Sequence, residues 1–571
     1  MRDLASEGMD PSRPPTHGDG TRAGRLRPGP AAALLLLAVG FALRARGISE
    51  YWLNPDEGIY YSTLTQPSFG RFWAEVTANA HPPAFYLLLR GMGFLTWDFV
   101  WLRAAPLLFG TAAIWVFWLV GRELGGSGTR GTVTGLVAAA LVALNPEAIT
   151  LSQVMRPYTL VVLLLGASLL QLLRYRAEPR DATLFRYAGL LSLAVLCHYS
   201  AALAVAALCA VLAHDAATGR LDRRGALRLA AAQAVPLLLI GAVYVAHLGS
   251  ALGSDLVGEA LDPGGWLGDW LIRSPTDAWN SLVSYQIFHL PAGLRLSALA
   301  LLLAAIATSA ARGERLVAVL AVGGLGVAIL ASVLGVYPFG PSRHNAWLTV
   351  FTIPPLAWLA GLVASAHRGR AAAGLAGVAA VIAAGSAAEG AALGRGAESP
   401  MARSNATEEK VLRRVDLAAL TVERLDPDRG PGLILMSEQS YNLMMPLFAG
   451  ARRAGPPSAD ADLFRFRHGT REVVVLRQWD WSGISDVQSV LERIAGAAPE
   501  PAGSLPDEIL VLAGGWGSVL LAQVPELDRL GVITDRSWAL GRDPAGQPVI
   551  RMMALVVDRR ALSELAPAPP G

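Results

Sequence analysis

A chain of 571 residues, of which 53% are hydrophobic and 16% charged, with a mean hydropathy of +0.41, is too apolar to be one soluble domain. Its charged residues are bunched between long apolar runs, which is typical of a helical membrane protein that crosses the bilayer several times. The formal net charge of +3 gives no general reason to expect nucleic acid as a partner. The two cysteines, Cys197 and Cys209, lie in apolar runs and exclude a disulfide framework or a zinc-finger site.

The first segment, residues 1–30, is rich in Pro, Gly and Arg and has no periodic apolar positions, so it is predicted to be a disordered tail. The run "AAALLLLAVGFA" (31–42) follows it. Because many further apolar runs follow and the tail is arginine-rich, we expect an anchoring first span with its tail in the cytoplasm, rather than a cleaved signal peptide.

The arginine clusters fix the expected topology, since cytoplasmic loops collect Arg and each span needs about twenty mostly apolar residues. One assignment of about eleven spans puts every Arg cluster on the same side. It gives a membrane domain over 31–395, with 82–95 half-embedded and with long outer segments at 46–103 and 248–292. The later spans are expected at 104–121, 132–148, 158–173, in a hairpin over 187–213, at 229–247, and in two pairs that turn at 312–315 and 367–370.

The remaining segment, 396–571, contains short apolar runs: "PGLILMS", "REVVVLR", "DEILVLAGG" and "PVIRMMALVV". Runs of this length are typical of strands, and the stretches between them favour helices or loops. We therefore predict a soluble α/β domain on the outer, extracytoplasmic side. The expected fold class is a polytopic α-helical membrane protein with a C-terminal soluble α/β domain.

The same topology gathers polar residues at the outer ends of the spans. They are Asp56, Glu57, His81, Arg103, Arg156, Tyr158, Arg343 and His344, with Glu147, Gln153, His198 and Tyr199 as further candidates. Single polar residues near helix ends commonly anchor or snorkel. An acidic pair together with three histidines and several isolated arginines on one face favours a site instead.

These residue types suit sugar transfer from a lipid-linked phosphate. A carboxylate can accept a proton from a hydroxyl as general base. Fixed guanidinium groups can hold a phosphate and stabilise the charge that it gains on leaving. Because phosphate is already a good leaving group, no matching acid is needed, in contrast to glycoside hydrolysis.

The motifs "LNPDEGIYY", "HPPAFYLLL", "LRAAPLLFG" and "LNPEAITLSQVMRPYTLVVLLL", in this order and spacing, resemble the multi-spanning GT-C glycosyltransferases. Within that group the chain looks like the branch of protein O-mannosyltransferases, aminoarabinose transferases and RgtA/B/C/D-like enzymes. The resemblance covers about residues 30–215, and "VYPFGPSRHNAWLTVFTIPPLAWL" resembles the late outer loop that carries an arginine.

The resemblance implies a polyprenyl-phosphate-linked sugar as donor and inverting transfer on the outer face of the plasma membrane, with an unknown acceptor. By motif, Asp56 corresponds to the base or to the carboxylate that orients the acceptor, with Glu57 supporting it. His81, Arg103, Arg156 and Arg343, with Tyr158 and His344 beside them, are expected near the donor phosphate or sugar. The family's "RLPS" reads "RAAP" here, which leaves Arg103 in place but puts its neighbours' contacts in doubt.

Some members of the fold use a divalent metal at the acidic loop. Asp56 and Glu57 are adjacent, so on a helix their side chains diverge by about 100°, and we expect no tightly bound metal. Two other classes stay open: a secondary transporter, although the spans are nearly charge-free and no repeat between the halves is seen, and a non-catalytic membrane scaffold with an extracytoplasmic interaction domain.

Overall fold

The computed structural model describes residues 28–79, 81–248, 268–291, 293–366, 412–417, 424–448, 463–476, 507–514, 519–542, 548–558 and 560–561. The predicted N-terminal tail up to residue 27, residues 249–267 of the outer segment 248–292, and the last expected span, which ends near 393, therefore lie outside the described residues.

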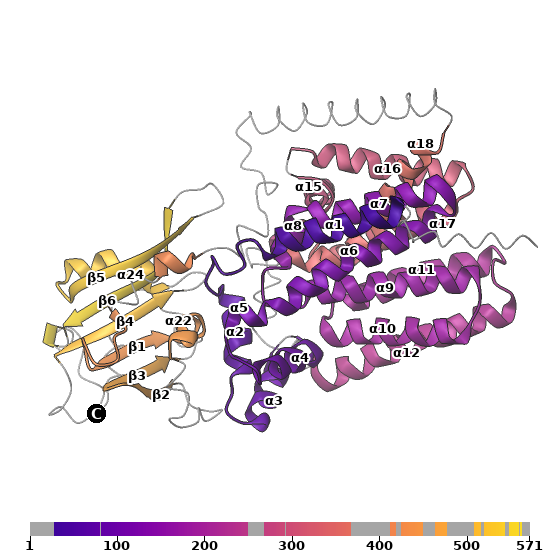
Figure 1. Ribbon diagram of the computed structural model, residues 1–571. Coiled ribbons are helices and arrows are strands. Elements are labelled where there is room, and N and C mark those ends of the chain that lie inside the picture. The colour runs from indigo at the N-terminus through magenta and orange to yellow at the C-terminus, as the bar shows by residue number, and fades with distance from the viewer. Residues whose placement is uncertain are drawn as a thin grey trace, which may run out of the picture.

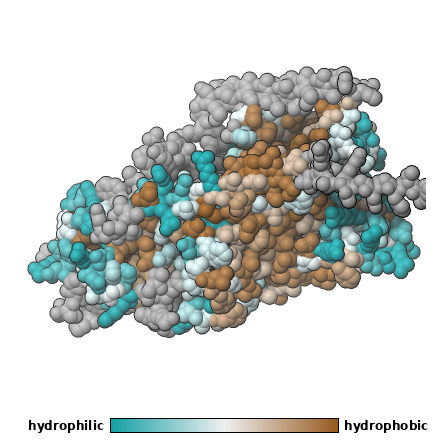
Figure 2. Space-filling view, in the orientation of Figure 1, coloured by the Kyte–Doolittle hydropathy of each residue, from teal (hydrophilic) through white to brown (hydrophobic). Residues whose placement is uncertain are grey.

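A bundle of long helices forms the larger part of the molecule (Figure 1). Five helical segments of the described residues are long and apolar enough to cross a membrane, and four shorter apolar helices accompany them. Figure 2 shows a broad hydrophobic band across the visible face of this bundle, with hydrophilic surface at both ends. The bundle helices are α1 (Pro28–Ala45), α6 (Ala104–Gly125), α7 (Gly128–Leu144), α9 (Tyr158–Ala177), α10 (Asp181–Cys197), α11 (Ala201–Ala217), α12 (Arg223–Val243), α16 (Arg295–Ala311), α17 (Arg315–Val333) and α18 (Thr349–Ala364).

Small residues let these helices approach closely. Such close packing is usual in a bilayer, because the hydrophobic effect does not drive helices together there. A Cβ on Gly121 of α6 would lie 2.7 Å from the carbonyl oxygen of Thr134 in α7. Arg44, at the end of α1, is fully buried and donates to the carbonyl oxygens of Val142 and Ala143 at the end of α7. Arg44 thus satisfies carbonyl groups that the end of α7 leaves open.

The segment between α1 and α6 folds into four short helices at one end of the bundle: α2 (Pro55–Leu64), α3 (Phe69–Ala78), α4 (Pro83–Gly93) and α5 (Phe99–Leu102). The 11 residues of α4 make it only about 17 Å long, far short of the roughly 30 Å of a bilayer core. This agrees with treating 82–95 as a segment that does not cross.

Further short elements lie between the long helices. They are α8 (Pro146–Leu151), the π-helix η1 (Tyr244–Leu248), η2 (Gly268–Trp270), α15 (Pro275–Ser284), η3 (Tyr285–Phe288) and the 3₁₀ helix η4 (Arg343–Leu348).

The C-terminal part contains a six-stranded mixed sheet with the strand order β2-β3-β1-β4-β6-β5. β1 is parallel to β3 and β4, and the other pairs are antiparallel. Four of the strands overlap the apolar runs singled out in the sequence, whereas β2 and β5 were not anticipated. The elements are β1 (Leu433–Ser437), α22 (Glu438–Met444), η6 (Met445–Phe448), β2 (Leu463–His468), β3 (Arg471–Leu476), β4 (Glu508–Gly514), α24 (Val519–Arg529), β5 (Ile533–Arg542) and β6 (Pro548–Asp558).

The sheet region is joined to the bundle through α2 (Figure 1). The Trp52 indole donates to the carbonyl oxygen of Leu443 over 2.7 Å. Gly58 of α2 lies so close to α22 that a Cβ there would be 2.8 Å from the carbonyl carbon and oxygen of Asn442. The C-terminal region therefore packs directly on the helix that carries the acidic pair.

Candidate active site

The acidic pair lies in the first turn of α2. Asn54 caps this helix, because its side chain accepts a hydrogen bond from the Glu57 backbone over 2.8 Å while the Glu57 carboxylate accepts from the Asn54 backbone over 3.2 Å. This reciprocal capping box, with Pro55 at the first helical position, fixes where the helix begins. The helical geometry then sends the Asp56 and Glu57 side chains in different directions.

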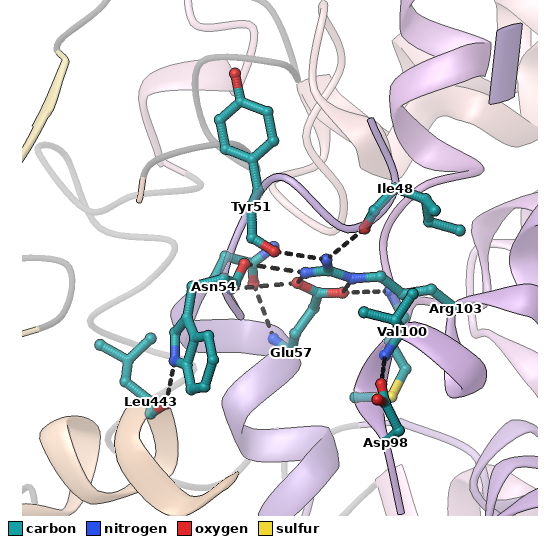
Figure 3. A network of polar contacts seen from close by, with 10 residues as sticks. Ile48, Tyr51, Asn54, Glu57, Asp98, Val100, Arg103 and Leu443 are labelled. Atoms are coloured by element: carbon teal, nitrogen blue, oxygen red, sulfur yellow. Dashed lines mark hydrogen bonds and ion pairs between the residues drawn. The ribbon is translucent and has the colours of Figure 1, made fainter. Parts of the chain in front are cut away.

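Glu57 is fully buried in an ion pair with Arg103 (Figure 3). The two guanidinium–carboxylate contacts measure 2.8 and 2.5 Å. Arg103 also donates to the backbone carbonyls of Ile48, Tyr51 and Trp52. Its five N–H donors therefore all have acceptors.

The other two hydrogen bonds to Glu57 come from backbone N–H groups. One is the capping contact from Asn54, and the other comes from Met155 over 2.6 Å. The pair thus ties the start of α2 to the residues before α9. The structure gives Arg103 a different place from the one that the resemblance implies: it supports α2, and its donors are not directed at a phosphate. Glu57 thus fixes the first turn of α2, in which Asp56 also lies.

Asp56 points instead toward two arginines from distant parts of the chain. Its Oδ2 atom lies 2.6 Å from Nη2 of Arg343, at the start of η4, and 3.3 Å from Nη1 of Arg156, in the turn before α9. The two arginine side chains are 9% and 5% exposed, and the Asp56 side chain is 21% exposed. The Asp56 side chain is therefore more exposed than the two cations that it contacts.

Aromatic rings surround these charges. The rings of His81 and His198 are 5.3 Å apart, and those of His198 and His344 are 6.4 Å apart. The Tyr158 ring lies 5.2 Å from His198, and its hydroxyl accepts from Arg156 over 3.1 Å. The cluster of Asp56, Arg156, Arg343, Tyr158, His81, His198 and His344 is called the charged cluster below.

Tyr60 extends the charged cluster and was missed in the sequence. It lies one helical turn after Asp56, stacks on Tyr86 with centroids 4.4 Å apart, and carries the Arg156 guanidinium 5.2 Å above its ring. The signal was present, because residues four apart share a face of a helix.

The electrostatics follow from this arrangement. Burial opposes ionisation of Asp56, but the guanidinium groups of Arg156 and Arg343 outweigh it and hold the pKa of Asp56 below its usual value. Burial, reinforced by the same two arginines, lowers the pKa of His81 well below its usual value and that of His198 to about 3. These two histidines are therefore neutral at neutral pH, and the arginines supply the positive charge of the cluster.

Neutral imidazoles can still donate one hydrogen bond each. Nδ1 of His198 lies 3.1 Å from the backbone N–H of Ser200, which donates to it. The proton of neutral His198 is therefore on Nε2, where it can be offered to an anion.

Of the remaining candidates, Glu147 lies in α8, Gln153 lies just after it, and Tyr199 lies between α10 and α11. Gln153 donates to the carbonyl oxygens of Arg44 and Arg46 at the end of α1. The Tyr199 hydroxyl is hydrogen-bonded to Nδ1 of His247, beyond the end of α12. Glu147 is buried in the first turn of α8.

The residues do not fit a divalent cation at the acidic pair. The Glu57 oxygens accept four hydrogen bonds, and Asp56 already faces two guanidinium groups, which would repel a metal ion. Within the described part of the chain, no group of three or more His, Cys, Asp or Glu side chains is arranged to hold a metal ion.

Comparisons with known proteins identify the fold. No protein-family model and no curated protein matches the chain. Among solved structures, the oligosaccharyltransferase of Archaeoglobus fulgidus matches with a TM-score of 0.50 and 13% identity over 91% of this chain and 74% of the other. ArnT of Cupriavidus metallidurans, solved with undecaprenyl phosphate, matches with a TM-score of 0.48 and 14% identity over 94% and 99%.

The match to the Saccharomyces cerevisiae O-mannosyltransferase complex Pmt1-Pmt2, at 14% identity and a TM-score of 0.30, spans 39% of this chain and only 33% of that one. The likeness to the archaeal enzyme shows that the fold is of the GT-C type, as the motifs indicated.

Proposed function

We propose that this protein is an inverting glycosyltransferase that moves a sugar from a polyprenyl-phosphate-linked donor to a hydroxyl group at the outer face of the plasma membrane. The observation that carries the proposal is the charged cluster, in which one carboxylate and two buried arginines meet at one end of a membrane bundle. The archaeal protein of the same fold is itself an oligosaccharyltransferase, which supports sugar transfer as the reaction class.

The arginines, the histidines and Asp56 of the charged cluster each have a role in this reaction. Arg156 and Arg343 hold the donor phosphate, and the neutral histidines offer it further N–H donors. The acceptor oxygen forms a bond to the anomeric carbon while the bond from that carbon to the phosphate oxygen breaks, and the electron pair leaves with the phosphate. The proton of the acceptor hydroxyl goes to Asp56, which is ionised beforehand.

The sidedness of the reaction follows from the arginine topology. We propose that the charged cluster and the C-terminal sheet lie on the extracytoplasmic side and that residues 1–30 lie in the cytoplasm. The donor is then reached from the outer leaflet, and the acceptor is a hydroxyl of a lipid, a cell-surface glycan or a protein.

The test is sugar transfer in membranes that contain either the native chain or Asp56→Asn at equal abundance. Total lipid extract supplies polyprenyl-phosphate sugars, and mass spectrometry detects new sugar on any acceptor. We expect a product with the native chain and none with Asp56→Asn. Asp181→Asn, which breaks an exposed ion pair with Arg228, is the matched control and should leave the product unchanged. A product that survives Asp56→Asn would remove Asp56 from the role of base.

A further inference from the structure

Arg156 and Arg343 have two anionic binding partners under the proposed function. In the proposed reaction they bind the donor phosphate, and in the structure they bind Asp56, at 2.6 and 3.3 Å. A single carboxylate oxygen receives both contacts. A phosphate that takes Nη1 of Arg156 and Nη2 of Arg343 therefore competes with the carboxylate for these two groups.

The competition also affects the base. A carboxylate held by two guanidinium groups is a weak proton acceptor, because both neighbours favour its ionised form. Asp56 is thus least suited to accept a proton when the donor is absent. Its reactivity should rise when a second anion draws the arginines away.

We propose that Asp56 is a latch as well as the base: it holds Arg156 and Arg343 until the donor phosphate takes them, and its release is what prepares it to accept the proton. This inference rests on the proposed function.

The charge balance of the described cluster fits each stage. Two arginines and one carboxylate, among neutral histidine rings, carry a net charge of +1. The donor is a phosphodiester with one negative charge, so its binding makes the cluster neutral. After transfer, Asp56 holds the proton and the product phosphomonoester approaches two negative charges, as expected from its second pKa of about 6. The positive charges of the two arginines balance these two negative charges, so the cluster is again neutral.

The latch also supplies a route for product release. The Asp56 side chain is 21% exposed, so it can lose its proton to water. The restored carboxylate then competes again for the arginines and weakens their hold on the polyprenyl phosphate. Tyr158 keeps Arg156 in place through these exchanges, because its hydroxyl accepts from the other terminal nitrogen of Arg156.

The latch can be measured as a change in affinity for a phosphate. Two ligands that compete for one group weaken each other's binding reciprocally. The probe is farnesyl phosphate, a short prenyl monophosphate, titrated calorimetrically into the purified full-length chain in detergent. An amide cannot hold the arginines as a carboxylate does. Asp56→Asn should therefore bind the probe about tenfold more tightly than the native chain, although it transfers no sugar.

Three variants make the outcome specific. Asp56→Glu keeps the negative charge and should bind near the native affinity. Asp181→Asn makes the same change of charge at an exposed pair elsewhere and should also bind as the native chain does. Arg343→Gln removes one phosphate ligand and should weaken binding. If Asp56→Asn does not fold, Asp56→Ser takes its place, with the same expected tightening.

The outcomes separate the latch from the proposed function. Equal or weaker binding by Asp56→Asn, with binding still lost in Arg343→Gln, would overturn the latch and leave the phosphate site standing. Binding that no cluster variant changes, or no binding to the native chain, would overturn both.

Discussion

At the scale of single residues, two adjacent carboxylates have entirely different surroundings. A separation of about 100° on the helix sends Asp56 to Arg156 and Arg343, and Glu57 to Arg103. The sequence predicted that the two side chains diverge, because only the helix geometry was needed. It could not assign their partners, since every partner arginine lies at least 46 positions away in the chain.

The buried pair of Glu57 and Arg103 should be a stability element. Glu57→Gln replaces one carboxylate oxygen, which accepts two hydrogen bonds, by an amide NH₂, which can only donate. Two of the buried N–H groups of Arg103, Asn54 and Met155 then lose their acceptor. We expect the unfolding free energy to fall by about 3 kcal/mol, seen as a lower apparent melting temperature in detergent. Glu178→Gln, in an exposed pair with Arg180, should leave the melting temperature unchanged. Equal effects of the two variants would contradict the assignment.

The histidines predict how stability depends on pH. The pKa values of His81 and His198 in the folded chain lie below the ordinary 6.5. Below about pH 6.5 the unfolded chain therefore binds more protons than the folded one, and stability falls as pH falls. The apparent melting temperature should be level above that pH and decline below it.

A histidine variant checks the source of that decline. His198→Gln should flatten part of it, whereas His214→Gln, in the last turn of α11 at the other end of the bundle, should keep the native dependence. If neither variant alters the decline, groups other than His198 cause it.

At the scale of elements, the prediction of the bundle helices came from hydropathy and from the placement of arginines. Helices lie at each expected span that the structure describes, because a long apolar run has few alternatives in a bilayer. Strands β2 and β5 were missed, since "LFRFRH" and "ITDRSWALGR" mix charges with apolar residues and read as loops. The contact between α2 and α22 was also out of reach, because nothing local in either helix signals it.

Gly58 tests whether that contact positions Asp56. Gly58→Ala would put a Cβ 2.8 Å from the Asn442 carbonyl, so α2 and α22 must separate. We expect a loss of stability of about 1–3 kcal/mol and slower sugar transfer. Gly91→Ala in α4 is the matched control, because a Cβ there meets nothing within 4 Å, and it should retain stability and activity. Full activity in Gly58→Ala would show that the site tolerates movement of the C-terminal region.

At the scale of the whole molecule, the bundle separates two faces. α9 begins at Tyr158, in the charged cluster, and its 20 residues extend about 30 Å, which matches the thickness of a bilayer core. We therefore expect Arg180, just beyond its far end, to lie across the membrane from the charged cluster. The sheet region lies on the same side as the cluster, since Leu443 and Asn442 contact the segment that carries Asp56.

Cysteine labelling in intact cells tests this arrangement and its orientation. In a background with Cys197 and Cys209 changed to Ala, single cysteines replace Arg529, in α24, and Arg180, whose side chains are 74% and 67% exposed. A membrane-impermeant maleimide should label Arg529→Cys from outside and Arg180→Cys only after the cells are opened. The reverse pattern would place the charged cluster in the cytoplasm and overturn transfer at the outer face. Labelling of both positions from outside would contradict a bundle that separates them, and the arginine-based topology would fail with it.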